Sequence, residues 1–188
     1  MRKRRAITIL LLVGVLLLPS VADVALAKTF TCKPGSTEQA PCTGSKKGDK
    51  ITGTTGADYI LAKKGKDNVN ALEGNDVVFG GPGNDAPLIG GFGDDDVFGE
   101  DGNDNLHGGP GDDKIYGGPG DDVIGDLNGL TFGNPADADV VFDGPGVDYV
   151  DLGDGDGNDV LCTTDGETLD GSDPGDQVID DPELCELL

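Results

Sequence analysis

Hydrophobic residues recur every nine positions between Gly53 and Gly125, each set within a polar, glycine-rich segment. The range divides into eight consecutive units, and in seven of them an apolar residue occupies the eighth position. These residues are Ile60, Val69, Val78, Val97, Leu106, Ile115 and Ile124. The fourth unit is one residue longer and has Pro87 at that place. We expect Leu88 or Ile89 to point inward there through a small bulge.

Each unit combines a tight turn with a short strand. The first six residues are rich in Gly, Asp, Asn and Pro, which suit turns with positive φ. The last three place one apolar side chain between two outward-facing neighbours, as a half-buried strand does. A fixed short period predicts a solenoid in which each unit is one structural step. Two units per coil would enclose a narrow core of one apolar residue per unit.

The period also divides the chain. Residues 28–52 form a polar, cysteine-bearing lead-in, and residues 53–125 form the array. A loop and degenerate repeats follow in residues 126–162. Terminal repeats of a solenoid are usually atypical because they cap an open core. We therefore interpret residues 163–188 as a C-terminal cap.

Residues 1–27 have the three parts of a signal peptide: a basic cluster at 2–5, an apolar run at 6–18 and an Ala-x-Ala site that ends at Ala27. A membrane-spanning helix needs about 20 apolar residues. Pro19 and Asp23 interrupt this run. We therefore expect cleavage after Ala27, secretion to the extracellular space, and no membrane insertion of the remaining chain.

The four cysteines all lie outside the eight units, at Cys32, Cys42, Cys162 and Cys185. An even number in a secreted chain favours disulfides. We prefer Cys32–Cys42 and Cys162–Cys185, because each pair closes a local loop at one end of the array. A zinc site is the alternative. The sequence has no CxxC motif to support a zinc site, and its only histidine, His107, lies inside the repeats.

The net charge of −23 makes nucleic acid and anionic membranes poor partners and makes cations favourable ones. Six lysines nevertheless cluster where the array begins. They are Lys46, Lys47, Lys50, Lys63, Lys64 and Lys66. This basic patch either pairs with the acidic turns nearby or meets an anionic polymer of a cell surface.

Every unit has Gly at its fourth position and Asp at its sixth, and the units from Gly90, Gly108 and Gly117 read Gly-Gly-x-Gly-x-Asp-x-apolar-x in full. This pattern resembles the hemolysin-type, or repeat-in-toxin, calcium-binding repeat. The resemblance implies an all-β fold, a parallel β-roll solenoid of nine-residue repeats, to which the cysteines add disulfide-bearing end segments. It also implies Ca²⁺ between stacked turns, held by the Asp carboxylate and backbone carbonyls. The candidate carboxylates are Asp58, Asp67, Asp76, Asp85, Asp95, Asp104, Asp113 and Asp122, followed in the degenerate repeats by Asp139, Asp148 and Asp159.

The type of ligand atom and the repulsion between carboxylates predict the same cation, Ca²⁺. Oxygen-only ligands select Ca²⁺ over softer metals. With two units per coil, Asp58, Asp76, Asp95 and Asp113 should line one edge, and Asp67, Asp85, Asp104 and Asp122 the other. Carboxylates about 4.8 Å apart repel by roughly 3–4 kcal/mol at an effective dielectric of 20. Four turns on each edge leave three gaps, so the array offers roughly six calcium sites. We predict a calcium-binding protein with a structural or scaffolding role.

Other functions have weaker support. The segment from Asp154 resembles the start of an EF-hand loop, but Asp159 stands where that loop needs Gly. The absence of HExxH, and of a serine in the repeats beside His107, argues against an enzyme. An outward apolar ladder on one face could serve self-association or adhesion to a cell surface. It consists of Leu61, Phe79, Phe98 and Tyr116.

Overall fold

The structure is a computed structural model that describes residues 28–125, 138–152, 159–163, 169–170, 176–180 and 182–185. The predicted signal peptide and the segment at 154–158 with the EF-hand resemblance lie outside these ranges. Within them, no helix is both long and apolar enough to cross a membrane.

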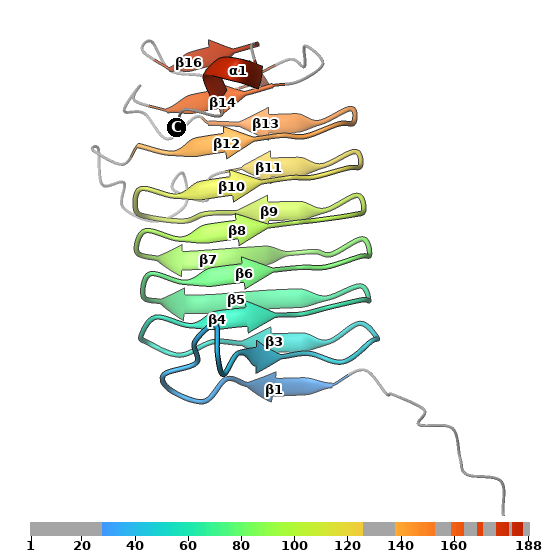
Figure 1. Cartoon of the computed structure of the whole chain (residues 1–188), viewed down its shortest axis with the longest axis vertical. Helices are drawn as coiled ribbons and strands as arrows, with labels where there is room; N and C mark the ends of the chain where they lie inside the picture. Colours follow the sequence, from blue (N-terminus) through green and yellow to red (C-terminus); the bar gives the residue numbers. More distant parts are fainter. Residues whose placement is uncertain are drawn as a thin grey trace, which may run out of the picture.

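The fold is the predicted parallel β-roll, in which successive strands alternate between two sheets (Figure 1). The first sheet contains β1 (Thr29–Thr31), β3 (Lys50–Thr52), β5 (Asn68–Glu73), β7 (Leu88–Phe92), β9 (Asn105–His107), β11 (Val123–Gly125), β13 (Tyr149–Asp151) and β15 (Leu169–Asp170). The second contains β2 (Cys42–Thr43), β4 (Tyr59–Leu61), β6 (Val77–Phe79), β8 (Asp96–Phe98), β10 (Lys114–Tyr116), β12 (Val140–Phe142), β14 (Val160–Cys162) and β16 (Gln177–Ile179). One short helix, α1 (Pro182–Cys185), follows β16.

The core is a double column to which each strand from β3 to β14 contributes one large apolar side chain. The seven residues expected to point inward are all buried, and each lies in register with its counterpart one coil away. In the fourth unit Leu88 takes the inward place, fully buried beside Val69, while Ile89 pairs with His107 in the outward row. The longer unit therefore shifts its inward residue by one position.

The roll extends beyond the periodic array at both ends. Residues 28–52 contribute β1, β2 and β3, and Ile51 on β3 is fully buried in the core. On the other side, β12, β13 and β14 lie within residues 138–162 and continue both sheets. The array of clear repeats is thus the middle of a longer solenoid.

Both preferred disulfides are present. Cys32 and Cys42 are bonded with their Cα atoms 5.4 Å apart, and Cys162 and Cys185 with theirs 5.8 Å apart. The first closes a loop beside the N-terminal strands, and the second ties α1 to β14. Each covalent loop therefore lies at one end of the roll, as the spacing of the cysteines predicts.

A column of stacked aromatic rings runs along the outer face of the second sheet. Phe79, Phe98, Tyr116 and Phe142 stack with centroids 4.5–4.7 Å apart and planes within 6° of parallel, and Tyr59 contacts Phe79 at the N-terminal end. All five are half-buried, because neighbouring rings cover each other's faces. Such contacts stabilise a sheet beyond their area of burial. The outward ladder therefore has a structural role, and its use as a partner surface stays a prediction.

Candidate metal centre

The turns place the candidate carboxylates in two rows, one along each edge of the roll. In each row the backbone N–H of one Asp donates to Oδ1 of the Asp one coil later, with N···O distances of 2.6–2.9 Å. The Asp58 row contains Asp58, Asp76, Asp95, Asp113, Asp139 and Asp159. The Asp67 row contains Asp67, Asp85, Asp104, Asp122 and Asp148. All eleven side chains are buried.

Asp49 precedes the Asp67 row, although the repeat pattern alone did not place it there. Its N–H donates to Oδ1 of Asp67, and its side chain is buried. Its unit, Gly44 to Thr52, keeps Asp at the sixth position and Ile51 at the eighth, but it has Lys47 at the fourth and Gly48 at the fifth. The spacing of Asp49 and Ile51 could therefore have identified this unit as a repeat, although the fourth-position glycine is missing. At the C-terminal end of the Asp58 row, Asp159 N–H donates to Oδ1 of Asp176 at 3.3 Å.

The second carboxylate oxygen is the unusual atom of these rows. Within the described part of the chain, Oδ2 is buried and lacks a hydrogen-bond partner in six carboxylates: Asp67, Asp76, Asp85, Asp95, Asp104 and Asp122. An unpaired buried acceptor is costly, and native structures contain few of them. Six equivalent unpaired oxygens along the two rows therefore indicate a ligand that supplies positive charge.

Missing side chains in the turn make room for these oxygens. From the unit of Gly80 onward, a Cβ on the first glycine would collide with Oδ2 of the Asp in that unit, as one on Gly90 would with Asp95. From the fourth unit onward, a Cβ on the fourth-position glycine would instead meet a carbonyl oxygen of the preceding turn, as one on Gly102 would meet that of Gly83. Both edges therefore carry backbone carbonyl oxygens close to the buried carboxylates.

Three of the four array units that lack the second glycine still form the same turn. Gly91 and Gly109 have φ of 126° and 111° at this position. Lys63, Leu72 and Glu100 replace that glycine in the units from Ala62, Ala71 and Gly99, and they adopt φ of 81°, 89° and 71°. A non-glycine residue in this region is strained by about 1–3 kcal/mol. The stacked turns therefore impose their geometry on unfavourable residues.

Burial raises the pKa of the central carboxylates well above the usual value of 3.8. The pKa reaches about 6 for Asp76 and Asp104, and about 7 for Asp85, Asp95 and Asp122. Neighbouring carboxylates in the same row add to this effect, as Asp104 and Asp67 do on Asp85. Without a cation the rows therefore hold protons close to neutral pH.

The donor set fits a hard cation. No group of three or more His, Cys, Asp and Glu side chains gathers within the described residues. A metal ion in the turns must therefore use carboxylate and backbone carbonyl oxygens together, a set that Ca²⁺ accepts in flexible geometry. His107 lies elsewhere, on the outer face of β9, with its Nδ1 3.0 Å from the carbonyl oxygen of Gly125. Burial lowers the pKa of its imidazole.

The family model for the RTX calcium-binding nonapeptide repeat (4 copies) matches residues 48–86 and 89–124. These two segments are RTX calcium-binding repeats. The match confirms the resemblance and supports calcium as the cation, and the matched RTX repeats contain Asp49 and all eight array carboxylates. No curated protein and no solved structure matches the chain significantly.

Calcium affinity should fall as pH is lowered from 7.5 to 5.5. Protons and Ca²⁺ compete for the same carboxylates, so affinity changes about tenfold per pH unit for each proton displaced. The calcium-free roll should show the opposite trend. The pKa values of its buried carboxyl groups are raised, so protonation of these groups stabilises the roll fully below pH 3.8. This stability is lost as pH rises to about 7 and the groups ionise. Calcium titrations at several pH values measure the first effect, and equal affinity at pH 5.5 and 7.5 would contradict it.

Proposed function

We propose that this chain is an extracellular calcium-binding structural protein whose roll forms when Ca²⁺ enters between stacked turns. The observation that carries the proposal is the set of six buried Oδ2 atoms without a hydrogen-bond partner, all within the RTX repeats. The carboxylates of the two rows would hold the ions together with carbonyl oxygens of the glycine-rich turns. Bound Ca²⁺ supplies the positive charge that cancels repulsion along each row.

The energetic balance makes calcium decisive for folding. Neighbouring carboxylates repel by roughly 3–4 kcal/mol per pair at an effective dielectric of 20. The apolar core contributes one side chain per strand, which is too thin to offset this along both rows. A ligand at a hundred times its dissociation constant stabilises a fold by about 2.7 kcal/mol per site. Roughly six sites would then contribute on the order of 16 kcal/mol, comparable to the whole stability of a typical domain.

An extracellular location suits this dependence on calcium. Two disulfides and the signal-peptide pattern of residues 1–27 both favour an oxidising compartment outside the cell. Extracellular calcium modules work at dissociation constants of about 10⁻⁴–10⁻³ M. The chain would therefore be exported while its repeats are unfolded and would fold where calcium is abundant.

Calorimetric titration of the purified protein with Ca²⁺, and separately with Mg²⁺, tests the proposal. We expect roughly six or more Ca²⁺ ions to bind cooperatively, because each bound ion orders the turns that form the next site. Mg²⁺ should not replace them, because it demands near-octahedral geometry and keeps its water. Binding of only one or two Ca²⁺ ions, or equal binding of Mg²⁺, would contradict the proposal.

A further inference from the structure

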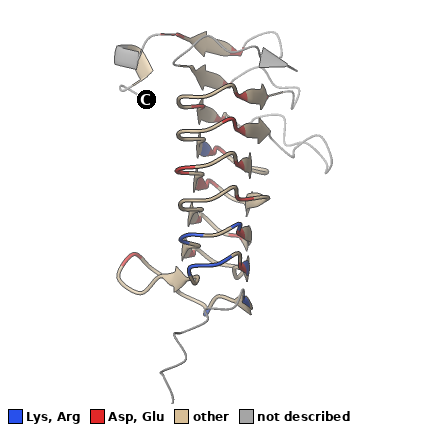
Figure 2. Cartoon of the chain, turned by 90° about the vertical axis from the view of Figure 1, so that its right-hand side faces the viewer, with Lys and Arg blue, Asp and Glu red and all other residues tan. Residues whose placement is uncertain are grey.

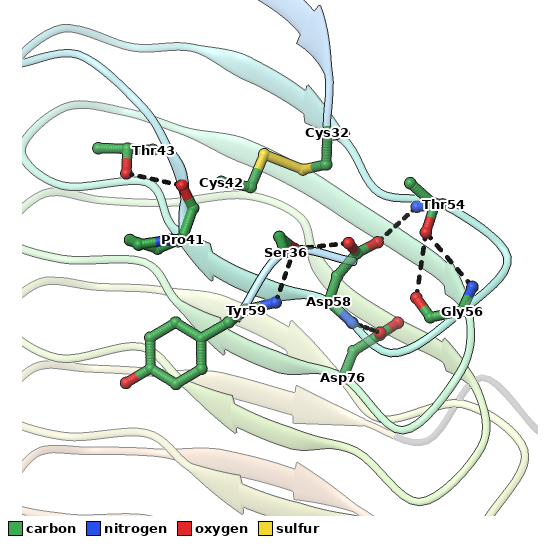
Figure 3. The surroundings of a disulfide bond; sticks show 10 residues. All are labelled: Cys32, Ser36, Pro41, Cys42, Thr43, Thr54, Gly56, Asp58, Tyr59 and Asp76. Carbon is green, nitrogen blue, oxygen red and sulfur yellow. Dashed lines mark hydrogen bonds between the residues drawn. A yellow bond between two sulfur atoms is a disulfide. The ribbon is translucent and has the colours of Figure 1, made fainter. Parts of the chain in front are cut away.

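The first carboxylate of the Asp58 row differs from those that follow. Oδ1 of Asp58 accepts a hydrogen bond from the hydroxyl of Ser36 at 2.6 Å, and its Oδ2 accepts one from the N–H of Thr54 at 2.6 Å (Figure 3). Both oxygens are therefore satisfied by the chain itself. The next carboxylate, Asp76, has a buried Oδ2 without such a partner.

Asp49, which precedes the Asp67 row on the same edge, is satisfied in the same way. Oδ1 of Asp49 accepts hydrogen bonds from the backbone N of Lys28 at 2.6 Å and from the hydroxyl of Ser45 at 3.1 Å. Its Oδ2 accepts one from the backbone N–H of Ser45. Asp67, one coil later, again has an unpartnered Oδ2. Each edge thus starts at a carboxylate that needs no cation to complete its hydrogen bonds.

The Cys32–Cys42 disulfide loop carries Ser36, which caps the Asp58 row. The Ser36 hydroxyl also accepts the N–H of Tyr59 at 3.0 Å, so it bonds both the carboxylate and the first residue of β4 (Figure 3). Within the loop, Thr37 and Ala40 exchange two backbone hydrogen bonds. Segments of this size usually need a disulfide to stay folded on their own. The Cys32–Cys42 disulfide therefore lies at the end of the roll where it can replace the stabilisation that calcium provides in the later coils.

Positive charge is concentrated on the same end of the roll. The six lysines of the basic patch are all exposed, and they occupy the turns around Asp49 and Asp67 and the start of β3 (Figure 2). They reduce the repulsion among the first carboxylates. The later turns carry Asp94, Asp101, Asp112 and Asp121 at exposed positions instead.

We propose that residues 28–61, the N-terminal template, hold their fold without calcium and provide the surface on which the RTX repeats fold when calcium binds. This inference rests on the proposed calcium-driven folding. In a solenoid each coil is stabilised mainly by its neighbour, so folding propagates from whichever coil is already formed. The template ends in β3 and β4. In the complete roll these strands pair with β5 and β6, so before the repeats fold their edges are open for pairing. Ordering would therefore proceed from the N-terminal end toward β14.

Hydrogen exchange of the full protein, followed by mass spectrometry, tests this directly. In excess chelator we expect amides of β3 and β4 to exchange at least tenfold more slowly than those of β6 to β12. In millimolar Ca²⁺ all of these strands should be protected. Equally fast exchange of β3, β4 and the later strands in chelator would overturn the template and leave calcium-driven folding intact. Protection of β6 to β12 in chelator would instead overturn the proposed function.

The serine caps can be removed separately from the calcium sites. A Ser36→Ala, Ser45→Ala double variant should lose the protection of β3 and β4 in chelator and refold several-fold more slowly after calcium is added. It should keep the protection pattern of the parent protein at saturating Ca²⁺. Thr55→Ala is the matched control, because this hydroxyl is exposed in an adjoining turn. A double variant that exchanges like the control in chelator would refute the assigned role of the serines.

Discussion

Asp95→Asn is expected to destabilise the calcium-loaded roll by about 3–5 kcal/mol and to stabilise the calcium-free form. Asp95 lies between Asp76 and Asp113 in its row, so its carboxylate faces two gaps, each worth about 2.7 kcal/mol when well saturated. Without calcium the sign reverses, since the substitution removes a buried charge whose pKa is raised to about 7. Oδ1 remains available as an acceptor for the N–H of Asp76. No purely structural role of Asp95 would produce opposite signs.

Urea unfolding in millimolar Ca²⁺ measures the first effect, and the amount of β-structure that circular dichroism detects in chelator measures the second. Asp101→Asn is the control, because it removes the same charge from an exposed position in a turn of the opposite edge. It should change stability in calcium by less than about 0.5 kcal/mol and leave the β-structure in chelator unchanged. If Asp95→Asn matched this control in calcium, the carboxylate row would not be the calcium site.

Gly102→Ala is expected to destabilise the calcium-loaded roll by roughly 3–5 kcal/mol. Gly102 has φ of 146°, a region that residues with a Cβ rarely adopt. Its Cβ would also collide with the carbonyl oxygen of Gly83 in the preceding turn, a rigid backbone atom. Backbone strain and overpacking each cost about 1–3 kcal/mol, and here they occur together.

Gly56→Ala provides a control at the same position of another unit. A Cβ on Gly56 meets no atom within 4 Å, because no regular turn of the same row precedes it. We expect this variant to change the free energy of unfolding by less than about 1 kcal/mol. Urea unfolding of both variants in calcium compares them. Equal destabilisation would show that close stacking of the turns does not account for the glycines.

The nine-residue period was sufficient to predict the middle of the fold. Because one unit is half a coil, the period places Ile60 over Val78 and Asp58 over Asp76, and both placements are confirmed. It left the fourth unit open, since an added residue allows either Leu88 or Ile89 to enter the core. Packing against Val69 and Leu106 selects Leu88.

The ends of the rows could not be predicted in this way. Ser36 reaches Asp58 across 22 residues only because the disulfide loop folds back over the first coil. Asp49 stayed hidden because its unit has no glycine at the fourth position. The sequence pattern predicted the outward ladder. The stacking of its rings and the contact of Tyr59 with Phe79 depend on side-chain geometry, which the pattern does not contain. Periodicity describes the repeated interior, whereas capping depends on contacts that occur once.

Far-ultraviolet circular dichroism of the purified protein, first in excess chelator and then in millimolar Ca²⁺, tests the central claim most directly. We predict that the chelated protein lacks most β-structure, with order confined to the N-terminal template. Adding calcium should produce the spectrum of a β-roll in a cooperative transition, and fresh chelator should reverse it. The same β-structure before and after calcium would contradict the claim that calcium controls folding.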